Sequence, residues 1–436
     1  MLSAEPGSYL SCSATERAES SSRFSSTRYV NNWLNRPINR WWSVLAGAVG
    51  TALGAGIVMG YGFGILAQSM IAELGWRRDI VANMYGAFSF GSGLGMLILG
   101  WLISQYGIRF PAVIFSILFG ICFASIAVIP PNPTIYLLLF TVVGLSGAAC
   151  SAMPYSVAVS GFFDRYRGLA LGLVIAGSGV GCMALPHLAE ALVNGPGWRT
   201  GFVLMGLGPG LIAAVGLIFL VRTPDGAVIG TGRVKIANRK AKLAFPSYLG
   251  SPFFWLILIP ILCVSIATSG VVGNLVFLFS DRGIPSTLIA TLLSVTGLSA
   301  WLGSLTGGVL LDRVFAPYAA ATVYALTAMG ILLLAFVPGT ASAFLAVSLI
   351  GLAVGSEAEI ITFLVGRYFT LADFSRIVGI IWVSWAWGGG AGIALGGKAY
   401  VLSGSYVAAL LFFAVALALA ASLMFFLGPY RYPQHD

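Results

Sequence analysis

The chain reads RTPDGAVIGTGRVKIANRKAKLAFPSYLGSPF over residues 222–253, a long polar segment between two halves that are almost wholly apolar. This segment contains one acidic residue, Asp225, and six basic residues, namely Arg222, Arg233, Lys235, Arg239, Lys240 and Lys242. Short basic loops are retained on the cytoplasmic face of a membrane. Six hydrophobic stretches lie on each side of it, so the sequence predicts twelve membrane spans joined in the middle by a basic cytoplasmic loop.

The composition excludes a water-soluble globule, because 58% of the 436 residues are hydrophobic, only 8% are charged and the mean hydropathy is +0.94. The net charge of +9 could indicate nucleic acid. Cations beside apolar spans fit a lipid bilayer better, so no nucleic-acid partner is expected. The five cysteines and two histidines show no metal-ligand spacing, so neither a metal nor a cofactor is expected.

The spans follow from length, because about 20 apolar residues cross about 30 Å of hydrocarbon. They are expected at 43–67, 80–103, 111–129, 134–160, 169–192 and 200–221, and then at 254–279, 287–311, 319–337, 343–366, 377–399 and 406–427. With both termini cytoplasmic, 18 of the 23 Lys and Arg residues fall on the inner side and 5 on the outer side, as the positive-inside rule requires.

The chain is therefore expected to be a multi-pass protein of a cell membrane, either a plasma membrane or a bacterial inner membrane. Its expected parts are a disordered cytoplasmic tail (1–40), a six-helix bundle (41–221), the basic linker (222–253), a second six-helix bundle (254–428) and a short cytoplasmic tail (429–436).

The two halves carry matching motifs. Gly100-Trp-Leu-Ile-Ser-Gln ends the second span and Gly308-Val-Leu-Leu-Asp-Arg ends the eighth, at an offset of 208 residues. The pair Gly144-Leu145 recurs as Gly351-Leu352 at an offset of 207. Such recurrence indicates a duplicated six-span unit, which is typical of transporters built from internal repeats.

This layout resembles the major facilitator superfamily. The family's loop motif Gly-x-Leu-x-Asp-Arg is intact at Asp312 and Arg313, whereas a serine and a glutamine replace its acid and base in the first half. Gly75-Trp-Arg-Arg and the stretch FFDRYRGLALG at 162–172 resemble the monocarboxylate and oxalate/formate branch. The resemblance implies an all-α integral membrane protein with twelve helices in two pseudo-symmetric six-helix bundles, which works as a monomer on a small-molecule substrate.

Ionisable residues inside the spans are scarce, and each is a functional candidate. Glu357 and Glu359 lie in the tenth span with no Lys or Arg within a turn. Desolvation disfavours the charged carboxylate, so at least one is expected to carry a proton during transport. Residues two apart point about 200° apart on a helix, so one is expected at the transport path and the other against a neighbouring helix. The alternative is that both are protonated and only structural.

Two further candidates for proton coupling, His187 and Glu190, close the fifth span three residues apart on one helix face. They could relay protons at the outer mouth, or simply lie at the wet interface.

The monocarboxylate branch implies a cation in the eighth span, and often one in the eleventh, that binds the substrate carboxylate. Here the eighth span holds no charge and 381–387 reads IWVSWAW. An acid would therefore bind through hydroxyls and amides or enter protonated; otherwise the substrate is neutral or aromatic and stacks on tryptophans. Candidates along the path are Tyr61, Gln68, Tyr155, Asn274, Trp382, Ser384, Trp385 and Lys398.

Glycines at small-xxx-small spacing are expected where the two halves meet and slide, as helices approach closely there. They are Gly91, Gly93, Gly95 and Gly100 in the second span, Gly172, Gly177 and Gly181 in the fifth, Gly303 and Gly307 in the eighth, and Gly388, Gly392 and Gly396 in the eleventh. The resemblance also implies a cytoplasmic gate in which Asp312 pairs with Arg165 or Arg167. Its expected members are Arg109, Arg165, Arg167, Asp312, Arg313 and Arg376.

The expected function is secondary active transport of a small, monocarboxylate-like organic acid by alternating access with proton symport. The alternative is proton-antiport efflux of a neutral or aromatic metabolite or drug. A transporter-like sensor would need an output surface, which the tail and linker hardly offer. A membrane-embedded enzyme is not expected, because the sequence has no catalytic, metal or nucleotide motif.

Overall fold

The computed structural model of the chain describes residues 41–106, 108–151, 154, 155, 167–220 and 247–431, and within them the structure is helical with no strand. The first half contains α2 (Trp41–Ala52), α3 (Ala55–Ile57), the π-helix η1 (Val58–Phe63), α4 (Gly64–Leu74), α5 (Arg78–Tyr106), α6 (Arg109–Ser125), α7 (Pro133–Gly147), η2 (Ala148–Cys150), α9 (Arg167–Asn194), α10 (Trp198–Val215) and η3 (Gly216–Leu220). The second half contains η4 (Ser247–Gly250), α11 (Pro252–Asp281), α12 (Ser286–Arg313), α13 (Ala316–Phe336), α14 (Thr340–Tyr368), α15 (Leu371–Ser403) and α16 (Val407–Met424).

The described residues include eleven helical stretches that are long and apolar enough to cross a membrane, and α6 is a shorter apolar helix of 17 residues. Local signals set the helix ends. Gly75 ends α4 with a φ of 65°, which glycine adopts without strain. The Asn132 side chain caps α7 by accepting from the Thr134 backbone N–H at 3.0 Å. The predicted all-α, multi-pass membrane fold is confirmed.

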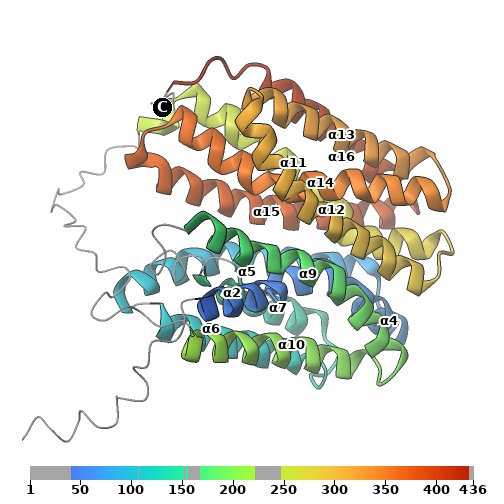
Figure 1. The fold of residues 1–436 in the computed structure, drawn as a ribbon. Coiled ribbons are helices and arrows are strands. Elements are labelled where there is room, and N and C mark those ends of the chain that lie inside the picture. The colour runs from blue at the N-terminus through green and yellow to red at the C-terminus, as the bar shows by residue number, and fades with distance from the viewer. Residues whose placement is uncertain (1–40, 107, 152–153, 156–166, 221–246, 432–436) are drawn as a thin grey trace, which may run out of the picture. The chain divides into compact units, whose positions relative to one another are not determined.

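The helices from Ser43 onward belong to one compact unit. Within the first half α5 packs on α7 and α6 on α10, and within the second half α12 packs on α14 and α11 on α15 (Figure 1). The halves meet where α5 packs on α15 and α9 on α12. These four are the predicted second, fifth, eighth and eleventh spans. The boundaries at 221 and 254 remain predictions, because most of the linker lies outside the described residues.

The glycine prediction holds for Gly93, which lies against Trp387 of the other half, but not for most of the other glycines. Gly91 and Gly95 in α5 lie against the backbone of α7, and Gly303 in α12 lies against α14, so these glycines allow close packing within one half. The same holds for Gly177 and Gly181 against α2, and for Gly388 and Gly392 against α11. Between the halves, the close glycines include Gly93 against Trp387, Gly179 against Trp301, Gly297 against Cys182, Gly390 against Ser89 and Gly397 against Ala82. Spacing alone identifies a face of small residues but not the helix that covers it.

Gly355 provides a test of this close packing. A Cβ atom there would collide with the Ala300 carbonyl oxygen on α12. Gly355→Ala is therefore expected to force α14 and α12 apart and to destabilise the protein by about 1–3 kcal/mol, the usual cost of overpacking. Gly308→Ala is the matched control, because a Cβ there meets no atom within 4 Å. Thermal unfolding in detergent measures both, and equal midpoints for the two variants would contradict the packing.

Candidate functional site

A cavity of about 690 Å³ lies between the two halves, a volume in the range of small-molecule sites. Its walls come from α3, η1, α5 and α9 of the first half and from α11, α12, α14 and α15 of the second. The π-helix η1 carries Tyr61 into this wall, where the buried hydroxyl lies beside the Cys182 thiol. Single π-turns inside helices are frequent at functional sites.

The charged residues that line the cavity, within the described part of the chain, are Glu357 and Glu359. Aromatic and small side chains supply most of the remaining wall. Trp301, Trp382 and Trp385 lie on it, and the rings of Trp382 and Trp385 meet edge to face, with centroids 5.6 Å apart. The cavity is therefore apolar and aromatic, with two carboxyl groups and no described cation.

Glu357 is only 5% exposed, and a donor reaches each of its oxygens. Thr268 Oγ1 donates to Oε1 at 3.0 Å, and Trp385 Nε1 donates to Oε2 at 2.6 Å. Within the described residues Glu357 takes part in no ion pair, and the titratable groups that interact with it electrostatically include the phenols Tyr61 and Tyr324. The carboxyl is thus held in place by neutral donors, with no described cation to compensate its charge.

Only one carboxyl oxygen of Glu359 accepts a hydrogen bond from a described residue. Ser304 Oγ donates to its Oε1 at 2.6 Å, whereas Oε2 is buried and has no hydrogen-bond partner among the described residues. Both glutamates border the same cavity, contrary to the expectation from their spacing. The cavity reaches from α11 and α15, which hold Glu357, to α12, which holds Glu359. The cavity extends around a large part of the circumference of α14. Glu357 and Glu359 can therefore both line it, although they lie on different sides of the helix.

The predicted substrate-path residues divide into two groups. Tyr61, Trp382 and Trp385 line the cavity, and Gln68, Tyr155, Asn274, Ser384 and Lys398 lie elsewhere. Asn274 donates to the carbonyl oxygens of Gly270 and Ile393, and so joins α11 to α15. Tyr155 is buried in a cluster with α2 and α9. Lys398 is exposed.

Sequence reasoning missed Thr268, Trp301 and Ser304. A lone hydroxyl or indole in an apolar span gives no signal of its own, because its importance comes from the carboxyl or helix opposite to it.

The second pair of proton-coupling candidates lies apart from this cavity. His187 is exposed, whereas Glu190 is 8% exposed and accepts a hydrogen bond from Ser286 on α12 at 3.2 Å. Although both residues lie on α9, their surroundings differ. Glu190 joins the two halves near the predicted outer end of the helices.

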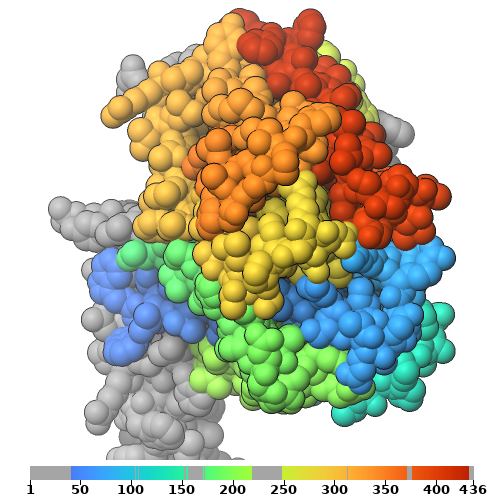
Figure 2. All heavy atoms as spheres, turned by 90° about the vertical axis from the view of Figure 1, so that its right-hand side faces the viewer, coloured from blue at the N-terminus to red at the C-terminus, as the bar shows by residue number. Residues whose placement is uncertain are grey.

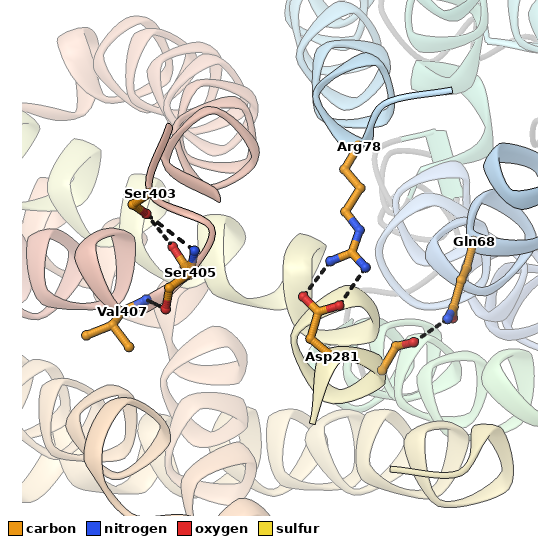
Figure 3. A network of polar contacts seen from close by, with 7 residues as sticks. Gln68, Arg78, Asp281, Ser403, Ser405 and Val407 are labelled. Carbon is orange, nitrogen blue, oxygen red and sulfur yellow. Dashed lines mark hydrogen bonds and ion pairs between the residues drawn. The ribbon is translucent and has the colours of Figure 1, made fainter. Parts of the chain in front are cut away.

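At that same end an ion pair joins the halves. Arg78, which begins α5, contacts Asp281, which ends α11, through two hydrogen bonds of 2.5 Å each (Figure 3). The guanidinium also lies over the Tyr400 ring, 4.6 Å from its centroid. Next to this pair Gln68 donates to Ser280 at 2.5 Å. We name Arg78, Asp281, Gln68 and Ser280 the outer lock; the charges at span ends that build it were not predicted as a pair.

The space-filling view is consistent with closure at the outer lock. Yellow atoms around the α11–α12 turn lie directly against green and blue atoms of the first half (Figure 2). In the turn before α16, burial raises the pKa of Tyr406 to about 12, so its phenol stays neutral beside the lock.

The predicted cytoplasmic gate is described only in part. Arg165 is not described, and Arg167 and Asp312 are described only by their place at the start of α9 and near the end of α12. Arg313 and Arg376 are exposed, and Arg109 donates to the Ile218 carbonyl oxygen at 3.1 Å. The gate therefore remains a prediction.

The sequence model of the Major Facilitator Superfamily matches residues 44–361, about three quarters of the chain. The chain belongs to this superfamily. Among solved structures, it is similar to a bacterial homologue of the human lysosomal transporter Spinster in an inward-facing and unoccupied conformation. The TM-score is 0.70 at 16% identity, over 90% of this chain and 97% of that one. That likeness shows the fold alone.

Relatives in sequence are also transporters. Monocarboxylate transporter 13 of Bos taurus is 26% identical over 305 residues, which are 67% of this chain and 66% of that protein. The riboflavin transporter RibJ of Trypanosoma brucei brucei is 41% identical over 75 residues, only 17% of this chain and 14% of that one. This chain therefore belongs to a family of membrane transporters, and the relatives that it matches are transporters and not enzymes.

Proposed function

We propose that this transporter couples the movement of a small organic solute to protons by alternating access, with Glu357 as the proton carrier. The observation that carries the proposal is a buried carboxyl that borders the cavity, is held by neutral donors and has no described cationic partner. A buried charge without a partner is costly, so such a carboxyl is expected to take up a proton readily and release it when water reaches the cavity.

Symport is the favoured mode. Glu357 and Glu359 are separate groups with separate hydrogen-bond partners, so a proton on one leaves the other free for substrate. Antiport by competition would need proton and substrate to exchange on a single carboxyl. Efflux by antiport remains the second candidate, favoured by the aromatic wall of the cavity.

The substrate is proposed to carry no negative charge where it binds. The similarity to monocarboxylate transporters supports an organic acid. The described cavity wall, however, contains two carboxyl groups and no cation. An organic acid is then expected to bind in its protonated form, and a neutral or positively charged aromatic compound fits the same wall. We further propose that both termini are cytoplasmic and that the monomer is the working unit.

Proteoliposomes test the proposed function. Purified protein is supplied with a panel of labelled organic acids, neutral aromatic compounds and aromatic amines, with and without an imposed pH gradient. At least one member is expected to accumulate only when the gradient is present and in the direction of proton flow. Equal uptake of every panel member with the gradient collapsed by an ionophore would refute proton coupling.

A further inference from the structure

From the wall of the cavity we infer that its substrate is an aromatic organic cation, whose ammonium group binds Glu359 and whose ring lies against the tryptophans. The inference rests on the proposed transport function and names the substrate class of the same cavity. It departs from the expectation of an organic acid, for three reasons that come from different features of the site.

The first reason is charge. With a proton on Glu357, Glu359 remains the one ionisable carboxylate among the described residues that line the cavity, and no described Lys, Arg or His lines it. A low-dielectric wall strengthens the field of such a charge. A bound cation would compensate the charge of Glu359, which is otherwise costly in this wall, whereas a bound carboxylate would lie near a like charge with no described counter-ion.

The second reason is an unsatisfied atom. Ser304 fixes Oε1 of Glu359 at 2.6 Å, while Oε2 is buried and receives no hydrogen bond from any described residue. Buried acceptors are nearly always paired, and leaving one without a donor is costly. An ammonium group supplies both the missing donor and the opposite charge. Glu357 offers no such position, because donors already reach both of its oxygens.

The third reason is the aromatic wall. Trp301 on α12 and the edge-to-face pair Trp382 and Trp385 on α15 border the cavity together with Glu359. Gly179 on α9 has no side chain where Trp301 lies, and a Cβ there would collide with the indole. The faces of aromatic rings attract cations and stack with other rings. The wall therefore suits a ring and an ammonium group in one molecule.

Three probes of nearly equal size test the inference: phenethylamine, a cation at neutral pH; 2-phenylethanol, which is neutral; and 3-phenylpropionate, an anion. Binding to purified protein in nanodiscs is measured by calorimetry and by quenching of tryptophan fluorescence. Phenethylamine is expected to bind at least about tenfold more tightly than 2-phenylethanol, a difference of about 1.4 kcal/mol, and 3-phenylpropionate most weakly. A preference for the anion, or no binding of phenethylamine at millimolar concentration, would overturn the inference.

Variants assign the preference to one carboxyl. Glu359→Gln is expected to remove the preference for phenethylamine over 2-phenylethanol, and Glu359→Asp, which retains the charge, is expected to keep it. Glu190→Gln is the matched control, because Glu190 is a buried glutamate outside the cavity wall. An unchanged preference in Glu359→Gln would refute the role of Glu359.

The binding assay is independent of transport. If the cation binds through Glu359 but no solute follows a pH gradient, the proposed coupling fails and the substrate class stands. If gradient-driven uptake is found but the anion binds best, the coupling stands and the substrate class fails.

Discussion

Glu357→Gln is expected to abolish accumulation driven by a pH gradient while retaining exchange of labelled for unlabelled substrate at equal pH. Glutamine resembles a permanently protonated glutamate in shape, and it can still accept from Thr268. It cannot release a proton, so the carrier can cycle with substrate but cannot convert the proton gradient into accumulation. Uptake and exchange are measured side by side in proteoliposomes that contain the same amount of protein.

Two controls separate coupling from folding in that experiment. Glu190→Gln replaces another buried glutamate, which joins the halves through Ser286 but lies outside the cavity wall. It is expected to retain gradient-driven accumulation. Trp385→Phe removes a hydrogen bond to Glu357 without removing the carboxyl, and is expected to shift the pH dependence of uptake while coupling persists. Full accumulation by Glu357→Gln would show that the proton travels elsewhere.

Breaking the outer lock is expected to expose the cavity to the outer side of the membrane. Asp281→Asn removes one charge of the ion pair with Arg78. The side chains of Arg78 and Asp281 are 26% and 27% exposed. Because partial exposure screens the pair, the loss is expected at the low end of the usual range for charged hydrogen bonds, about 1.4 kcal/mol. A change of this size shifts the ratio of outward-open to closed conformers about tenfold.

A native thiol reports this shift. Cys182 lines the cavity and is 5% exposed. In a background without the other cysteines, Asp281→Asn is expected to increase its labelling by a membrane-impermeant reagent applied from the outer side. The control is Glu73→Gln, which breaks the ion pair of Glu73 with Arg199 within the first half only. Equal labelling of the two variants would mean that the Arg78–Asp281 pair does not hold the halves together.

The sequence alone was enough to predict the membrane helices, the two glutamates within a span and the two-part architecture, because these depend on local composition. Apolar stretches of span length predicted the membrane helices, because hydrocarbon requires each backbone group to be satisfied within its own helix. The scarcity of ionisable residues in the spans singled out Glu357 and Glu359, since a charge in such a span is rarely kept without a use. The matching motifs predicted a two-part transporter, and the family is confirmed.

Tertiary structure alone decided which groups face each other. The helical separation of Glu357 and Glu359 suggested different surroundings, yet the cavity extends around α14 and reaches both. Glycine spacing marked close approaches but not the partner helix. Arg78 and Asp281 are 203 residues apart, and their pairing depends on where α5 and α11 end in space. Hydrophobicity acts on each span separately, whereas a hydrogen bond or ion pair needs two distant segments at one place, which no local pattern specifies.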